Sequence, residues 1–152
     1  MRTHHVEESV RIVRPPADVW AAIADYPFDL RWRKGITEMT PDPPGPPAIG
    51  TRVHEVLRLS GKHFTTDSTV VELDPGVSYA FAGNGTSGDV RGARTVRATP
   101  DGEGADFTYA IELRPTRGLR ALGPLLVPML RSGLRKDLSR LKDLLERDGR
   151  AG

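Results

Sequence analysis

The side chains that could carry out chemistry lie mainly in the middle of the chain, where Val, Thr, Tyr and Phe are frequent. Glu55 alternates with Val53, Leu57 and Leu59, so in a strand it would share their face. Two interpretations remain open. Glu55 points into the interior as a candidate general base, or it marks the place where the strand meets solvent. No other residue is identified as catalytic.

Two tyrosines and three further polar residues are candidates for contact with a ligand. Tyr79 and Tyr109 each lie within an apolar alternation and carry a hydroxyl that could orient a ligand, although a core tyrosine with a satisfied hydroxyl has the same pattern. His63, Asp67 and Arg94 could converge on the same ligand, but bulges decide which face each of them occupies. These residue types suit the positioning of a ligand and match no known reaction motif.

Metal and phosphate binding find no support in the sequence. The chain has no cysteine and four histidines, His4, His5, His54 and His63. Because adjacent residues of a strand point to opposite faces, His4 and His5 are poorly placed to bind one metal ion. The glycine-rich segment 83–88 lies between two predicted strands and lacks the lysine of a phosphate-binding loop, so we predict a turn there. We expect no metal and no cofactor.

The elements that position these residues follow one another in a clear order. Alternating apolar residues predict a strand over 5–14, which Pro15 and Pro16 end because the second proline suits the first turn of a helix. That helix is followed by a second short helical piece at 28–33. Further strands, joined by short turns that favour antiparallel pairing, are predicted at 36–40, 51–59, 62–73, 77–82, 90–99 and 105–114, with a proline-rich loop at 41–47.

A long amphipathic helix is predicted over residues 117–147, because leucines recur there every three or four residues. Pro124 and Pro128 should kink this helix or split off a short first turn. The segment from Arg114 onward is basic, with ten Arg or Lys against four Asp or Glu. It lacks aromatic residues and its acidic residues are interspersed, so we expect a solvated face and no nucleic-acid partner.

The length of 152 residues indicates a single domain over residues 1–152. No apolar run reaches the about 18 residues that a membrane-spanning helix needs. The N-terminus carries no apolar signal core, so we predict a cytoplasmic protein without stable membrane insertion. We expect a monomer or a homodimer.

Three segments carry a resemblance to a known family: IVRPPADVW at residues 12–20, Trp32, and LSRLKDLLE at residues 138–146. Together with the order of elements, they resemble the polyketide cyclase/dehydrase branch of the START-like (SRPBCC) superfamily over nearly the whole chain. The resemblance implies an α+β helix-grip fold, in which a curved antiparallel sheet wraps around the long C-terminal helix and two short helices follow the first strand. Members include carriers as well as aromatases and cyclases, so the fold leaves the function open.

The expected function is binding of a hydrophobic small molecule, lipid-like or polyketide-like, in an apolar cavity between the sheet and the C-terminal helix. One alternative is a cofactor-free polyketide cyclase or dehydratase, and another is a protein-interaction module with a collapsed cavity. The loop 41–47 and the segment 118–128 are expected to form the gate. The residues predicted to bind the ligand are Trp32, Leu57, Tyr79, Phe81, Arg94, Phe107, Tyr109, Ile111, Leu126, Leu130 and Leu134.

Overall fold

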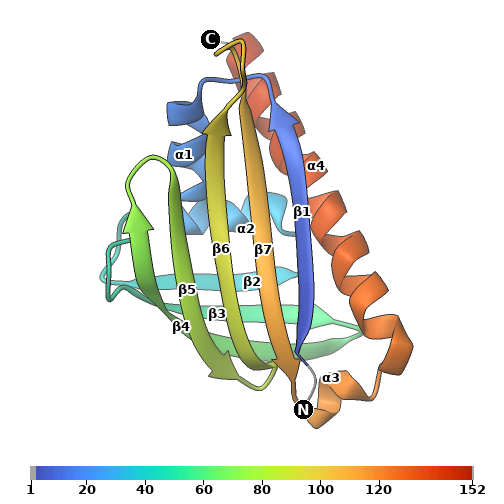
Figure 1. The fold of residues 1–152 in the computed structure, drawn as a ribbon. Helices are drawn as coiled ribbons and strands as arrows, with labels where there is room; N and C mark the ends of the chain where they lie inside the picture. Colours follow the sequence, from blue (N-terminus) through green and yellow to red (C-terminus); the bar gives the residue numbers. More distant parts are fainter. Residues whose placement is uncertain (1–2, 152) are drawn as a thin grey trace.

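One antiparallel sheet of seven strands forms most of the structure (Figure 1), a computed structural model that describes residues 3–151 and the side chains up to residue 147. The spatial order of the strands is β1-β7-β6-β5-β4-β3-β2. Their bounds are β1 His4–Ile12, β2 Ile36–Asp42, β3 Arg52–Leu59, β4 Lys62–Asp74, β5 Ser78–Gly85, β6 Gly88–Ala98 and β7 Ala105–Pro115. The expectations for the extreme N-terminus and for a domain over 1–152 extend to residues 1, 2 and 152, which lie outside the described residues.

The sheet is strongly curved. In Figure 1, β2, β3 and part of β4 run across the direction of β1, β7 and β6. The pairing register shifts between Ile36 and Glu38 in β2 and between Val70 and Glu72 in β4, and such irregularities bend a strand and increase its twist. The curvature gives the sheet a concave face. All the helices of the described residues lie on this side of the sheet, and the convex side carries none of them (Figure 1).

Several strands extend beyond their predicted bounds, and β5 and β2 do so into segments predicted as a turn and a loop. The segment 83–85, predicted as part of a turn, belongs to β5, and the chain reverses at Thr86 and Ser87 instead. A side chain at Gly83 or Gly85 would overlap the backbone of β4, so the glycines permit close approach of two strands. Likewise β2 continues through Pro41 because it is an edge strand, where a missing amide donor need not break a ladder.

Short helices follow the first strand as predicted. They are α1 (Pro16–Ile23), the 3-10 turn η1 (Tyr26–Phe28) and α2 (Asp29–Trp32). The expected long helix is split into α3 (Arg117–Arg120), η2 (Gly123–Leu125) and α4 (Leu126–Ala151). The break lies at Gly123, whose φ of +56° favours glycine, and directly before Pro124. The predicted curved sheet with a long C-terminal helix and short helices after the first strand is confirmed.

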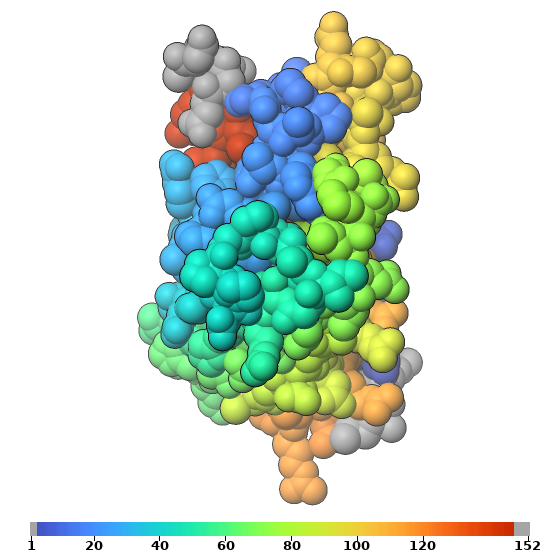
Figure 2. All heavy atoms as spheres, turned by 90° about the vertical axis from the view of Figure 1, so that its left-hand side faces the viewer, coloured from blue at the N-terminus to red at the C-terminus, as the bar shows by residue number. Residues whose placement is uncertain are grey.

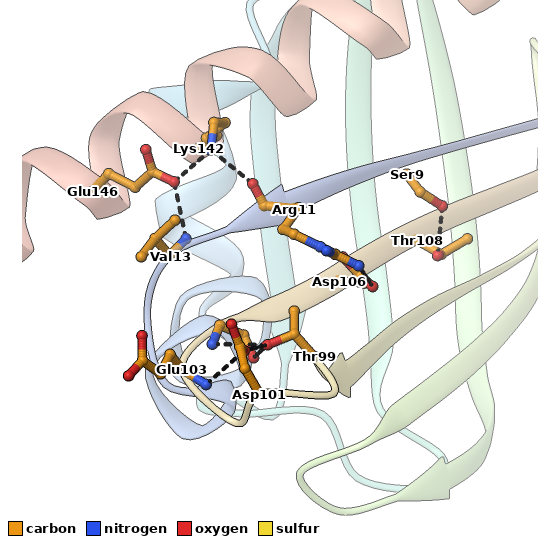
Figure 3. Close-up of polar contacts among 11 residues, drawn as sticks. Ser9, Arg11, Val13, Thr99, Asp101, Glu103, Asp106, Thr108, Lys142 and Glu146 are labelled. Atoms are coloured by element: carbon orange, nitrogen blue, oxygen red, sulfur yellow. Dashed lines mark hydrogen bonds and ion pairs between the residues drawn. The ribbon is translucent and has the colours of Figure 1, made fainter.

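The C-terminal half of α4 is tied to the end of β1 (Figure 3). Lys142 Nζ donates a hydrogen bond to the carbonyl oxygen of Arg11 at 2.8 Å, and the amide of Val13 donates to Glu146 Oε2 at 2.9 Å. On the concave side, Leu138 and Leu141 are fully buried in the main core. This half of the helix therefore rests tightly on β1, and α4 also packs on α2.

The main core contains a cluster of aromatic rings. Trp32 meets Phe107 and Tyr109 edge-on, with ring centroids 6.2 and 6.4 Å apart. Edge-on contacts place the positive edge of one ring against the negative face of the next. A second, smaller core lies under α3 and contains Phe64, Leu113, Leu119 and Leu126. None of the helices in the part of the chain that the structure describes is long and apolar enough to cross a bilayer.

The connection between β2 and β3 lies on one side of the molecule. Figure 2 shows it in teal near the centre of the view, below α1 in blue. It contains the proline-rich segment and a cis peptide bond between Asp42 and Pro43. Ile49 is exposed on this connection.

The packing of the concave face can be tested by a substitution at Gly92 of β6. It lies opposite Phe81 of β5, and a methyl group at residue 92 would collide with the Phe81 ring and lie 2.9 Å from the carbonyl oxygen of Ala110. We predict that Gly92→Ala lowers the free energy of unfolding by about 1 to 3 kcal/mol, because the ring must move. Urea denaturation measures the change. Gly118→Ala is the control, since a methyl group there finds an ordinary 3.8 Å contact with Phe64; equal losses in both variants would contradict the prediction.

Candidate functional site

A cavity of about 460 Å³ lies between the concave face of the sheet and the N-terminal half of α4. This size is within the range of small-molecule sites, which is about 300 to 1,000 Å³. The apolar part of its lining comes from β1, the start of β2, the end of β3, β5, β6, β7, α3 and α4: Val6, Ile36, Leu57, Leu59, Phe81, Val90, Ile111, Leu113, Leu119, Met129, Leu130 and Leu134. The cavity is open to solvent on one side and is not collapsed.

The cavity exists because the two halves of α4 pack differently. The C-terminal half is anchored on β1 by Lys142 and Glu146, as described above. Toward the N-terminal end of the helix, Leu130 is only half-buried and Gly133 has no side chain to fill the space beside it. A methyl group on Gly133 would meet no atom within 4 Å. The helix therefore leaves a gap above β3, β4 and β7 that side chains do not close.

The inner end of the cavity is next to a buried ion pair. Arg94 of β6 is 1% exposed. Both of its terminal nitrogens donate hydrogen bonds to the carboxylate of Asp29, with Nη1 3.0 Å from Oδ1. Nη1 also lies 3.0 Å from the carbonyl oxygen of Ile23, and the guanidinium carbon is 4.6 Å from the centre of the Tyr109 ring. The two-pronged contact orients Arg94 and links β6 to α2.

Arg33 continues the network toward the cavity. Its Nη1 lies 3.2 Å from Asp29 Oδ2 and 2.8 Å from Glu55 Oε1. Asp29 thus bridges the guanidinium groups of Arg94 and Arg33, and Glu55 supplies a second negative charge next to Arg33. Two arginines and two carboxylates leave this buried group without formal net charge, which lowers the cost of removing it from water.

Burial and charge act in opposite directions on these groups. Burial alone would lower the pKa of Arg94, but Asp29 and the nearby tyrosines raise it well above its usual value. Burial likewise opposes the charge of Arg33, while Glu55 raises the pKa of that guanidinium. Burial raises the pKa of Tyr26 to about 12. Both arginines are therefore charged, and the hydroxyl of Tyr26 is neutral, at physiological pH.

A small cavity of about 20 Å³ lies beside the inner end of the large one and shares Glu55, Ser68, Phe81 and Tyr109 with it. It has room for about one water molecule or one ligand oxygen. Tyr26 also lines it, and the hydroxyl of this residue is buried without a hydrogen-bond partner among the described residues. Polar atoms are therefore gathered at the inner end of the large cavity, whose remaining lining is mainly apolar.

The exposed residues of the lining are Lys34, Arg58, Gly133 and Lys136, so the mouth of the cavity has one edge on α4 and another on the segment 34–36 and the end of β3. Met129, Gly133 and Lys136 recur at a spacing of three or four residues and so lie along one side of α4. The other edge carries Lys34 and Arg58. The amide of residue 34 donates to Asp137 of α4 at 3.3 Å, which joins the two edges at one end of the mouth.

The predicted ligand-binding residues fall into three groups. Leu57, Phe81, Tyr109, Ile111, Leu130 and Leu134 line the large cavity. Tyr79 and Arg94 line the small one. The structure places the remaining three outside both cavities: Trp32, Phe107 and Leu126.

Packing explains why these three residues lie elsewhere. Trp32 of α2 and Phe107 of β7 are fully buried against each other, in one core with Leu138 and Leu141 of α4. Leu126, at the first turn of α4, packs into the second core with Phe64 and Leu119. Their apolar alternation indicated burial correctly but did not distinguish a filled core from a cavity.

Glu55, the candidate general base, lines both cavities and is half-buried, so it does not lie at a frayed strand end. Its carboxylate forms an ion pair with Arg33 and so balances the buried charge of that guanidinium.

His63 and Asp67 do not converge with Arg94: both are exposed, and Asp67 accepts a hydrogen bond from His54 at 2.7 Å. This hydrogen bond raises the pKa of His54.

Asp29 and Arg33 were not predicted as site residues. The only signal in the sequence is their spacing of four residues in DLRWR, which on a helix brings a carboxylate and a guanidinium together. The same spacing is common on solvated helices, so it did not indicate burial.

Among residues 3–147, no three His, Asp or Glu side chains come close enough together to hold a metal ion.

Among solved structures, a protein from Thermus thermophilus, TTHA0849, is similar over 93% of this chain and 97% of its own, with 18% identity and a TM-score of 0.78. The Zhui aromatase/cyclase from Streptomyces sp. R1128 is similar over 97% of this chain and 93% of its own, with 16% identity and a TM-score of 0.70. At these identities the likeness shows the fold alone, and the expected helix-grip fold is confirmed.

A family model described as polyketide cyclase / dehydrase and lipid transport matches residues 3–146. A search of curated protein sequences gives no match. The family match thus spans the sheet, the short helices and nearly all of α4.

The buried pair of Arg94 and Asp29 yields a stability prediction. Arg94→Met leaves the Asp29 carboxylate buried with Arg33 as its remaining cation, so we expect a loss of about 3 to 5 kcal/mol in the free energy of unfolding. The exposed pair of Arg11 and Asp106, with Nε 2.9 Å from Oδ1, is the matched control, and Arg11→Met should cost less than about 1 kcal/mol. Guanidinium chloride denaturation measures both.

A double variant separates pairing from packing. Arg94→Met with Asp29→Leu removes both charges, so its loss should be smaller than the sum of the two single losses. Additive losses would show that the two side chains do not depend on each other, contrary to the geometry described above.

Proposed function

Because the chain belongs to the polyketide cyclase/dehydrase and lipid transport family, we propose that it binds a mainly apolar small molecule, lipid-like or polyketide-like, in the cavity between the sheet and α4. The observation that carries this proposal is the volume of about 460 Å³ with twelve apolar side chains in its lining. Burial of ligand surface against such a wall contributes roughly 25 cal/mol per Å² removed from water.

The polar inner end gives the ligand a direction. Tyr109 and Ser68 lie in the lining beside Arg33 and Glu55, so a ligand that reaches them meets hydroxyls and a compensated ion pair. A carbonyl or hydroxyl oxygen suits this end, because it can form hydrogen bonds without adding an unbalanced charge. The ligand would then have an apolar body with a neutral polar group at its inner tip.

A second function, cofactor-free cyclisation or dehydration of a polyketide-like chain, has one specific observation in its favour. Glu55 and Tyr109 line the same inner end, so a proton acceptor and a proton donor would lie within one cavity. Against this, the Glu55 carboxylate is held by Arg33 at 2.8 Å. Binding requires only the shape and the apolar wall, and we therefore prefer it. The cytoplasmic location and the state as a monomer or homodimer stay predictions.

Gly133 permits a direct test of binding in the cavity. A side chain at this position has open space and would grow into the mouth, so Gly133→Phe should obstruct it without disturbing the core. We expect the dissociation constant of the uncharged fluorescent probe phenylnaphthylamine to rise about tenfold or more. The unfolding temperature should stay equal or rise, because glycine costs about 1 kcal/mol relative to alanine inside a helix.

Gly133→Ala is the matched control, since it gains the helix stability and adds only one methyl group; its affinity for the probe should stay near that of the wild type. Equal probe affinity in the Phe variant and the wild type would place the probe elsewhere and contradict the proposal. Mass spectrometry of organic extracts of the purified protein then identifies any bound compound. Turnover of a polyketide-like chain that is lost in Glu55→Gln, with binding retained, would favour the cyclase instead.

A further inference from the structure

Three cations at the mouth of the large cavity have no ion-pair partner among the described side chains: Lys34, Arg58 and Lys136. The other charged residues in the lining are matched. Arg33 pairs with Glu55, and Arg140 pairs with Asp137. All three unmatched side chains are exposed. The positive charge of the lining is therefore concentrated where the cavity opens to solvent.

The inner end has the opposite character. Arg94 and Arg33 are balanced there by Asp29 and Glu55, so a charged ligand group would add an uncompensated charge to a buried region. A negative group at the mouth avoids this cost, because it stays in contact with water while it approaches the three cations. The rest of the lining is mainly apolar, and the hydroxyls of Thr66 and Ser87 within it are hydrogen-bonded to each other at 2.7 Å.

This distribution of charge, on the basis of the binding function proposed above, names the ligand class more closely. We propose that the ligand is an elongated amphipathic anion whose acidic group lies at the mouth among Lys34, Arg58 and Lys136, with its apolar chain directed inward. The acidic group is a carboxylate, sulfate or phosphate, each of which accepts hydrogen bonds from ammonium and guanidinium groups. The low-dielectric walls beside the mouth strengthen the attraction and speed association.

Dodecanoate and dodecanol form a matched pair of probes, since they share one chain and differ in the charge of the head group. In the triple variant Lys34→Met, Arg58→Met, Lys136→Met, we expect dodecanoate affinity to fall about tenfold at low salt and dodecanol affinity to stay within about twofold. Methionine keeps an unbranched apolar stem, so the wall loses charge more than contact. Isothermal titration calorimetry measures both affinities, and the preference for dodecanoate should also shrink as salt is raised.

A second triple variant controls for total charge. Arg52, Arg97 and Arg147 are exposed and lie outside the cavity lining, so their replacement by Met removes the same formal charge away from the mouth. This variant should bind dodecanoate as the wild type does. An equal loss in both triple variants would show a general effect of net charge and overturn the assignment of the mouth.

The outcomes separate this inference from the proposed function. Weaker dodecanol binding in Gly133→Phe would place dodecanol in the cavity. If the triple variant of Lys34, Arg58 and Lys136, called the mouth variant, then binds dodecanoate as tightly as the wild type, only the proposed position of the anionic head group is refuted. If neither probe binds the wild type or competes with phenylnaphthylamine, the binding function fails and the inference fails with it. A loss of both probes in the mouth variant alone, with unfolding temperature retained, would mean that the three side chains act through apolar contact and would also overturn the inference.

Discussion

The buried ion pair between Arg94 and Asp29 is the constraint on which the arrangement of the site depends. A guanidinium that is 1% exposed cannot remain charged without a carboxylate at contact distance, and Asp29 supplies both of its oxygens. The pair fixes α2 against β6, which in turn places Arg33 at the edge of the cavity. Glu55 then becomes the counter-charge of Arg33 across the inner end. One electrostatic requirement thus connects Asp29 of α2 and Arg33, which directly follows α2, with β6 and β3, two strands far apart in sequence.

The cavity results from an uneven attachment of α4. Polar contacts from Lys142 and Glu146 hold the C-terminal half on β1 (Figure 3), and leucines bury it there. The other half is separated from α3 by Gly123 and Pro124 and carries Gly133 beside the cavity. The two halves of α4 therefore differ in their packing, because the part that closes the core is not the part that borders the cavity.

Glu55 has a different role in the structure from the one that its place in the sequence suggests. An acidic residue in a strand of an apolar sheet invites the interpretation of a general base. In the structure its first task is electrostatic, since without it Arg33 would share the single carboxylate of Asp29 with Arg94. A residue that balances a buried cation can still face a ligand, which is why Glu55 belongs both to the structural network and to the cavity lining.

The sequence by itself determined the elements, their order and most of the apolar faces, because alternation in strands and three-to-four spacing in helices are local patterns. It predicted Leu57, Phe81, Tyr109, Ile111, Leu130 and Leu134, all of which line the cavity. Only the tertiary structure decided that Trp32, Phe107 and Leu126 fill cores instead, and that Asp29 and Arg33 join Arg94 and Glu55. An apolar pattern specifies that a side chain leaves water, whereas the partner it meets depends on sheet curvature and on where α4 is anchored, and both arise from contacts between residues distant in the chain.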